Sequence, residues 1–580
     1  MRRNLTAHAF LIGAVLCFGF FSWYPMVREV ILAFQKTEKG VVSWASWSNF
    51  VYVFNDPDFA LAWRNTALFT LLALLLGFVV PFVVALVLNE FRHARGYLRL
   101  LVYLPVMLPP VASVLLFKYF YDPGHGLFNR LLELFGLPAQ QWLQSSDTAM
   151  LSLVIASTWM NMGGACLIYL AALQTIPGEL YEAAELDGAG LLRKIWHVTV
   201  PQTRLILSLL FLMQIIATMQ VFTEPFLLTG GAGPEGSTTT VVHLIYQYAF
   251  NFSNYGAAAA LGLVLLVVLA ASRRRTSAST VPNRSRAATM TTRTLISPAR
   301  LSRPRGRLLY WTVLFLVVAV FTLVFIGPLY WMVTSGLKDT EEFARIPPTL
   351  VPDAVHPGNY GEAWHVMEVS QLLLNTLYYA FGALAFQLVL DVAAAYSLSK
   401  LRPVLGKAIL GAMLATLMIP ATVLVVPQYL TVLDLPVFER NLLNTLWVIW
   451  LPSVTNAFNI FLLKRFFDSI PRELLDAAAI DGASPMRALR SVVLPISRPI
   501  LGVVSIFAVV GVWKDFLWPM LALPDPGKQT LNVGIYSLAS GVPENWLLAA
   551  LAMASLPTLI LFLIFQRNIM SGLTAGGLKG

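Results

Sequence analysis

Long apolar segments, separated by short polar ones, follow one another along the whole chain. A membrane-spanning helix needs about 20 mainly apolar residues. Twelve such segments lie at about 9–27, 65–89, 98–120, 149–173, 204–228, 240–271, 309–334, 375–398, 407–431, 443–464, 499–523 and 546–566. The pattern predicts an all-α polytopic membrane protein with about twelve transmembrane helices. Composition agrees, because only 12% of the 580 residues are charged, against about 25% in soluble domains.

Two of the polar segments repeat one another. Residues 176–207 and 470–501 align without a gap at an offset of 294, and close to half of the aligned positions are identical. Self-similarity at a fixed offset is the mark of a duplicated architecture. We therefore expect two parallel six-helix halves, residues 1–271 and 308–580. The linker between them, 272–307, carries ten arginines and no acidic residue.

Each repeated segment has the composition of two short helices joined by a turn outside the bilayer. A proline opens it, acidic residues occupy the first turn, two alanines follow and a glycine permits the turn. The central positions are Glu182, Ala183, Ala184, Asp187 and Gly188 in the first copy, and Asp476, Ala477, Ala478, Asp481 and Gly482 in the second.

Basic residues gather on one side of the membrane if the spans alternate. That side holds Arg2 and Arg3, the turns near 92–99 and 400–407, the linker and both repeated segments. Because cytoplasmic loops are rich in Lys and Arg, we expect both termini in the cytoplasm. The linker is predicted to be a disordered tether, with contact to anionic lipid as the alternative role. The net charge of +10 then reflects membrane orientation and does not indicate nucleic-acid binding.

Polar and aromatic residues inside apolar spans are candidates for a substrate pathway. Intramembrane ionisable groups are functional candidates by default, although interhelical hydrogen bonding is the plainer alternative. The candidates are Gln214, Thr218, Gln220, Glu224, Trp513, Lys514, Asp515 and Trp518. Pro225 and Pro519, at equivalent positions, predict a break in each of the two spans. Asn65 and Asn375 are each followed by threonine and are predicted to cap the second span of their half. Asp391 has no counterpart and no assigned role.

Motifs for catalysis are absent from the sequence. There is no G-x-x-x-x-G-K-[ST] phosphate loop and no G-x-S-x-G nucleophile motif. The seven histidines are scattered, and Cys17 and Cys166 lie in apolar runs where packing is their expected role. We expect a transport protein without catalytic residues, a metal site or a cofactor of its own.

The Glu-Ala-Ala and Gly spacing of both repeats resembles the EAA loop of permeases in binding-protein-dependent ABC importers. The second copy has Asp476 in place of the first Glu, which keeps the charge. The resemblance implies a type I importer permease fold in the plasma membrane of a prokaryote. It also implies that the two loops dock two copies of a cytoplasmic ABC ATPase, which holds ATP and Mg. An extracytoplasmic binding protein would deliver the solute.

The C-terminal sequence QRNIMSGLTAGGLKG resembles the end of the second permease in carbohydrate importers of the maltose and glycerol-phosphate type. The segments VFTEPFLLTGGAGP at 221–234 and WKDFLWPML at 513–521 are similar to that family at the same places. This implies a fusion of a first-permease-like and a second-permease-like half that moves a sugar or sugar-like solute. It further implies that the tail, 567–580, contacts the ATPase through Gly572, Thr574, Gly576 and Lys579.

Two other classes of protein remain open. An ion-coupled secondary transporter would need paired intramembrane acids, for which Asp391 and Glu224 are thin support. A polytopic membrane enzyme would need clustered acids at one face. The ion-coupled transporter does not explain the two repeated segments, and the sequence shows no such cluster of acids for an enzyme.

Overall fold

The computed structural model describes residues 2–38, 41–91, 93–124, 126–274 and 304–577. Within these residues helices dominate, and one small antiparallel hairpin pairs β1 (Gln35–Glu38) with β2 (Val41–Trp44). The helices of the first half are α1 (Arg2–Phe18), α2 (Tyr24–Ala33), α3 (Ser48–Asn55), α4 (Pro57–Ala73), α5 (Val79–Glu90), α6 (Arg95–Met107), α7 (Pro110–Phe120), α8 (Leu127–Leu134), α9 (Ser146–Leu173), α10 (Gly178–Leu186), α11 (Leu191–Lys194), α12 (Val200–Thr218), α13 (Thr223–Thr229), α14 (Val241–Tyr246) and α15 (Tyr255–Arg274). Most of the predicted linker lies outside the described residues.

The second half begins at α17. Its helices are α17 (Pro304–Ser335), α18 (Thr340–Phe343), α19 (Gly358–Val366), α20 (Val369–Tyr396), α21 (Gly406–Thr416), α22 (Val425–Leu433), α23 (Trp447–Ser453), α24 (Ala457–Ser469), α25 (Arg472–Ile480), α26 (Pro485–Ala488), α27 (Leu494–Ile496), α28 (Arg498–Lys514), α29 (Leu517–Ala522), α30 (Leu531–Leu538) and α31 (Glu544–Gly577).

Helices lie over all twelve predicted spans, but several spans are broken. In the described part of the chain, seven helical stretches are long and apolar enough to cross a membrane, or up to nine if each of two bent pairs counts as one. One bent pair is α6 and α7, which meet at 97° next to Pro109 and Pro110. Proline removes a helical hydrogen bond and ends or kinks a helix. The spans predicted at 407–431 and 443–464 are likewise divided, into α21 with α22 and α23 with α24.

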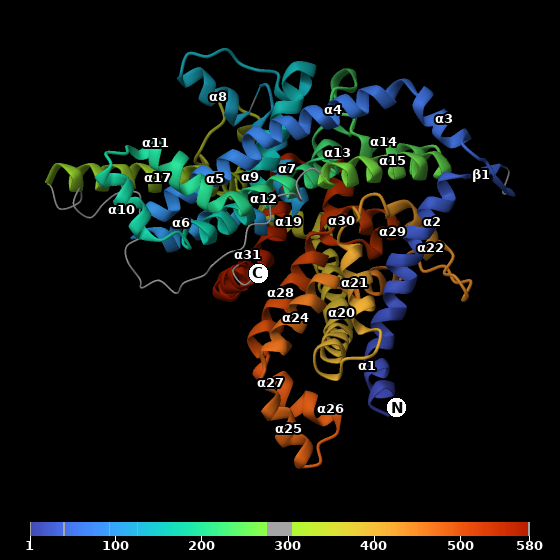
Figure 1. Cartoon of the computed structure of the whole chain (residues 1–580). Helices are drawn as coiled ribbons and strands as arrows, with labels where there is room; N and C mark the ends of the chain where they lie inside the picture. The colour runs from blue at the N-terminus through green and yellow to red at the C-terminus, as the bar shows by residue number, and fades with distance from the viewer. Residues whose placement is uncertain (1, 39–40, 92, 125, 275–303, 578–580) are drawn as a thin grey trace.

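The two halves exchange their first helices, as Figure 1 shows for α1, which lies beside α20. The Ser397 hydroxyl donates to the Ala7 carbonyl at 2.7 Å. Conversely, α17 packs against α6 of the first half, and the Trp159 indole N–H donates to the Val324 carbonyl at 2.8 Å. Each half is therefore completed by the other, which favours folding of the chain as one unit.

The prediction that Asn65 and Asn375 cap the second spans is wrong. The helices α4 and α20 begin well before them, so both side chains lie inside a helix. The Asn65 amide donates to the carbonyls of Gly236 and Thr239 at 2.8 and 3.1 Å. Asn375 makes the matching bonds, to Gly527 and Gln529 at 2.9 and 3.1 Å. Both asparagines hold the connection that precedes α14 or α30, where backbone groups need partners.

Asp391 acquires a structural role. Its side chain is fully buried, and Oδ1 accepts from the Asn456 N–H at 3.2 Å. Asn456 in turn caps α24, because its Oδ1 accepts from the N–H groups of Phe458 and Asn459. The free N–H groups at a helix N-terminus require such acceptors. Asp391 thus stabilises the break between α23 and α24.

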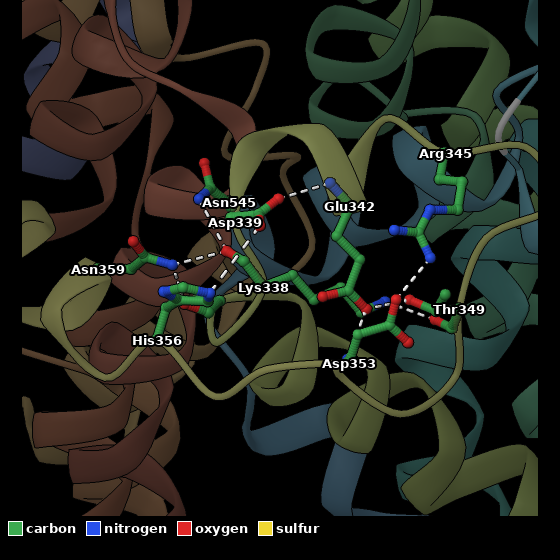
Figure 2. Close-up of polar contacts among 10 residues, drawn as sticks. Lys338, Asp339, Glu342, Arg345, Thr349, Asp353, His356, Asn359 and Asn545 are labelled. Carbon is green, nitrogen blue, oxygen red and sulfur yellow. Dashed lines mark hydrogen bonds and ion pairs between the residues drawn. The ribbon is translucent and has the colours of Figure 1, made fainter.

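A network of polar side chains, with Lys338 and Glu342 buried in it, orders the connection between α17 and α20 (Figure 2). The Lys338 ammonium donates to the Thr349 carbonyl at 2.5 Å. Glu342 accepts from the Thr349 hydroxyl at 2.6 Å and from the Asp353 N–H at 3.0 Å. Burial lowers the pKa of the Lys338 ammonium, and the nearby Glu342 and Asp353 carboxylates oppose this shift. Asn359 and Asn545 both donate to the Lys338 carbonyl, so the network also fixes the start of α31.

Candidate functional site

The fifth span of each half breaks at the same point, as the two prolines predict. In the first half α12 ends at Thr218 and α13 begins at Thr223; in the second half α28 ends at Lys514 and α29 begins at Leu517. Phe222 and Phe516, which correspond at the offset of 294, precede the second helix of each pair. Backbone that leaves the helix at membrane depth is tolerated beside protein or a water-filled cavity. The two breaks line one cavity.

That cavity has a volume of about 640 Å³ and lies between the halves. Pockets for small molecules measure roughly 300–1,000 Å³, so a small solute can be accommodated. The first half contributes Phe69, Ala73, Gly77, Pro110, Ser157, Thr158, Asn161, Met162, Ala165, Gln214, Ala217, Thr218, Gln220, Val221, Phe222, Thr223 and Glu224. The second half contributes Ala421, Thr422, Val425, Gln428, Pro452, Ser453, Lys514, Asp515, Phe516, Leu517 and Trp518.

The structure brings seven of the eight predicted pathway residues together at this cavity. They are Gln214, Thr218, Gln220, Glu224, Lys514, Asp515 and Trp518. Trp513 is the exception, since it lies in the apolar core with 3% of its surface exposed. Its neighbour Trp518 also directs its indole N–H away from the cavity, to the Val448 carbonyl at 2.9 Å. Trp518 therefore offers the cavity an apolar surface.

Sequence reasoning missed a polar face on α9. Ser157, Thr158 and Asn161 line the cavity from the fourth span, and the Ser157 hydroxyl donates to Glu224 Oε1 at 2.8 Å. The Asn161 amide donates to the Ser157 carbonyl at 3.0 Å. Residues at i and i+4 share one face of a helix. The spacing of Ser157 and Asn161 in an apolar span could therefore have predicted this polar face.

Two hydrogen bonds join the halves at the cavity wall. The Lys514 ammonium donates to the Val106 carbonyl at 2.5 Å. Gln220, which corresponds to Lys514 at the offset of 294, accepts from the Thr422 hydroxyl at 3.3 Å. Both residues reach across to the bend in the third span of the opposite half. These contacts are pseudo-symmetric, but only the Lys514 bond is charge-assisted.

The repeated segments fold into the predicted pairs of short helices, α10 with α11 and α25 with α26 (Figure 1). In the first pair the N–H groups of Gly188 and Ala189 donate to the carbonyls of Glu185 and Ala184 at 3.0 and 2.9 Å. In the second pair Gly482 and Ala483 make the equivalent bonds at the same two distances. This is the Schellman ending of a helix, which requires a left-handed residue. Gly188 and Gly482 supply it with φ of +74° and +75°.

Both helix pairs present their predicted residues on the surface. The carboxyl side chains of Glu182, Asp187, Asp476 and Asp481 are exposed, whereas Ala184 and Ala478 are half-buried. Sequence reasoning missed an exposed aliphatic side chain at the end of each first helix. Leu186 is 89% exposed and Ile480, its counterpart, is 87% exposed. The aligned repeats have an aliphatic residue at both positions, and this shared feature could have predicted the two exposed side chains.

The two helix pairs differ in what holds them internally. In the first pair Lys194 forms an ion pair with Glu185 at 2.8 Å, and at the equivalent positions the second pair has Ala488 and Ala479. The Tyr181 hydroxyl contacts Thr199 at 3.0 Å, where the second pair has Leu475 and Val493. At these positions the first pair has polar contacts where the second has apolar side chains, of which Leu475 and Val493 pack in one hydrophobic cluster.

The predicted ATPase-contacting tail is only partly described. Backbone helix α31 continues to Gly577 and so includes Gly572, Thr574 and Gly576. Lys579 lies outside the described residues.

Paired six-span halves, a cavity between them and two exposed helical loops define a polytopic membrane transport protein. Residues 77–274 and 388–574 each match the family model described as "Binding-protein-dependent transport system inner membrane component". The chain belongs to this family and contains its domain twice.

Several curated relatives align with about half of this chain. The probable ABC transporter permease protein YurN of Bacillus subtilis is 32% identical over 280 residues, which cover 46% of this chain and 93% of YurN. The trehalose/maltose transport system permease protein MalF of Thermococcus litoralis is 30% identical, covering 43% and 81%. The sn-glycerol-3-phosphate transport system permease protein UgpE of Rhizobium meliloti is 29% identical, covering 45% and 94%. A chain of a solved bacterial alginate ABC transporter is 26% identical, with a TM-score of 0.42, and covers 48% of this chain and 98% of its own.

Proposed function

We propose that this chain forms the complete transmembrane pathway of an ATP-driven importer for a sugar or sugar-like solute. The single observation that carries this proposal is the pair of exposed helical loops with matching Schellman turns. Two equivalent loops on one chain suit two copies of one partner. Each loop presents one exposed aliphatic side chain, Leu186 or Ile480, among polar residues, an arrangement compatible with an apolar contact inside a polar rim. The partner would be an ABC ATPase, on which ATP and Mg would bind.

The cavity supports a sugar as the solute. Amide, hydroxyl and carboxyl side chains line it together with Phe222, Phe516 and Trp518. Sugars present hydroxyl groups at their edges and C–H groups on their faces, so such walls suit them. The relatives named for trehalose, maltose and glycerol phosphate support the same solute class.

A binding protein outside the cell would deliver the solute. With both termini placed in the cytoplasm, the connection between α17 and α20 faces outward. Its polar network leaves four aliphatic side chains at least half exposed: Ile346, Leu350, Val351 and Val355. An ordered loop that exposes apolar groups suits protein contact, so we place part of the binding-protein contact there.

Transport would couple to ATP through a shift between two global states. Closure of the ATPase pair on ATP would draw the two helical loops together and favour the outward-facing state, as would the loaded binding protein. Release of ADP and phosphate would favour return to the inward-facing state.

The proposal is tested by purifying the tagged chain from native membranes in mild detergent and identifying co-purifying proteins by mass spectrometry. An ABC ATPase at about two copies per chain is the expected result. The double variant Glu182→Arg, Asp476→Arg should lose the ATPase and uptake while still inserting into the membrane. Glu235→Arg with Glu439→Arg is the matched control, because both residues are exposed in loops that are expected on the opposite side and lie outside the connection between α17 and α20. Retention of the ATPase by the first variant would contradict the assignment.

Ion coupling is the second candidate because one buried acid has no partner. Glu29 of α2 is 2% exposed, and neither carboxyl oxygen has a hydrogen-bond partner among the described residues. Uptake that survives ATP depletion but stops when the proton gradient is collapsed would favour this candidate.

A further inference from the structure

We propose that the cavity takes uncharged sugars and rejects anionic ones such as uronates and sugar phosphates. This inference rests on the proposed function and specifies the charge of the solute. Family membership leaves the point open, since the relatives named above include one for trehalose and maltose and one for glycerol phosphate.

The cavity lacks the groups with which proteins bind anions. Among the described residues that line it, Lys514 is the single cation, and there is no arginine. Anionic groups are held by arginine forks, by clustered cations or by free N–H groups at helix N-termini. The N-termini of α13 and α29 face the cavity, but each already has a carboxyl group, from Glu224 and Asp515.

The ammonium of Lys514 is partly engaged by the protein itself. Its ammonium donates to the Val106 carbonyl at 2.5 Å, near the end of α6, where the helix dipole is negative. The bond holds one of the three N–H donors of the ammonium and ties it to this wall. Moving the ammonium towards a solute would weaken the bond, which is costly away from water. Lys514 is therefore a single tethered cation, which does not by itself make the cavity an anion site.

The remaining polar groups suit hydroxyl partners. The carboxyl groups of Glu224 and Asp515 outnumber the one ammonium, so with both ionised the lining has one net negative charge. A lining of net negative charge repels an anionic solute, and the repulsion grows as water is displaced from between the charges. The uncharged lining consists largely of side chains that donate and accept hydrogen bonds, such as Ser157, Thr158, Asn161 and Gln428. Such groups match neutral sugar hydroxyls.

The test measures solute binding to the full chain in lipid nanodiscs by tryptophan fluorescence, with Trp518→Phe identifying the part of the signal that arises at the cavity. The probes are maltose and raffinose as neutral sugars, and digalacturonate and trigalacturonate as anionic ones. We expect saturable binding of a neutral sugar and at least about tenfold weaker binding of the uronates, a factor that corresponds to roughly 1.4 kcal/mol.

Charge variants separate this inference from the proposed function. Asp515→Asn alone, and with Glu224→Gln, should reduce the discrimination against uronates severalfold, provided the variants remain monodisperse. Glu235→Gln with Glu341→Gln, outside the cavity, should leave it unchanged. Uronate binding as tight as neutral-sugar binding would overturn the charge inference and leave sugar transport standing. Failure of every saccharide to bind would overturn the sugar proposal itself, while the ATPase co-purification still tests the importer.

Discussion

The ammonium of Lys514 donates to the main-chain carbonyl of Val106 in the opposite half of the molecule. In a continuous helix this carbonyl would accept from the N–H group of residue 110, but Pro110 has none. The bend between α6 and α7 thus creates an unpaired acceptor, and Lys514 satisfies it. The lysine of one half therefore supplies the hydrogen bond that the proline of the other half removes, and this bond joins the two halves.

Replacement of Lys514 by Met keeps the length of the side chain and removes its donor. Hydrogen bonds to charged groups contribute about 1.5–3 kcal/mol, so we expect a lower melting temperature of the purified chain and a looser contact between halves. Thermal unfolding in detergent measures the first effect. Lys407→Met, at an exposed position of α21, is the control and should change little. Equal melting temperatures for both variants would show that the bond does not hold the halves together.

Replacement of Gly188 or Gly482 by Ala should weaken coupling without a steric clash. An added Cβ would meet no atom within 4 Å at either position, but φ of +74° or +75° costs a non-glycine residue roughly 1–2 kcal/mol. We expect reduced ATPase co-purification and uptake. Gly190→Ala is the matched control, because Gly190 has φ of −70° and equally open surroundings. An equal effect of all three changes would exclude the turn as the cause.

Replacement of Leu186 and Ile480 by Asp should abolish ATPase binding while the chain stays folded. Both side chains are almost fully exposed, and surface changes usually alter stability by no more than about 0.5 kcal/mol. Co-purification should fall at least about tenfold if the two tips enter pockets of the partner. Val404→Asp changes another exposed aliphatic residue, 76% exposed, and should not affect the partner. Unchanged co-purification in the double variant would remove these tips from the docking surface.

Asp391→Ala should destabilise the second half by about 1–3 kcal/mol, the cost of leaving a buried N–H group unsatisfied. Asp391→Asn keeps an oxygen that can accept from the Asn456 N–H, so it should retain most of the stability and support uptake. Thermal unfolding and uptake measured together test both variants. A folded Asp391→Asn protein without uptake would instead indicate that the ionisable carboxyl itself takes part in transport.

Local patterns along the chain predicted more of this protein than its fold class. The apolar segments anticipated where helices occur, and the repeat anticipated two equivalent helix pairs outside the apolar spans. Periodicity did not predict that α21 and α22, or α23 and α24, would be separate helices. Asn65 and Asn375 were misread for a similar reason: an asparagine before an apolar run can cap a helix or serve a distant backbone. The two asparagines bond across 171 and 152 residues, and no local pattern contains such a partner.

The sequence by itself determined the membrane class, the duplication, the paired loops with their glycine turns and most of the polar residues at the cavity. These features depend on short-range effects: segment hydrophobicity, helix capping and the backbone freedom of glycine. Only the tertiary structure decided that α1 and α17 exchange partners, that Trp513 faces the core while Asp515 faces the cavity, and that Lys514 compensates Pro110. Each of these depends on which surfaces meet when two halves pack, and packing pairs residues hundreds of positions apart.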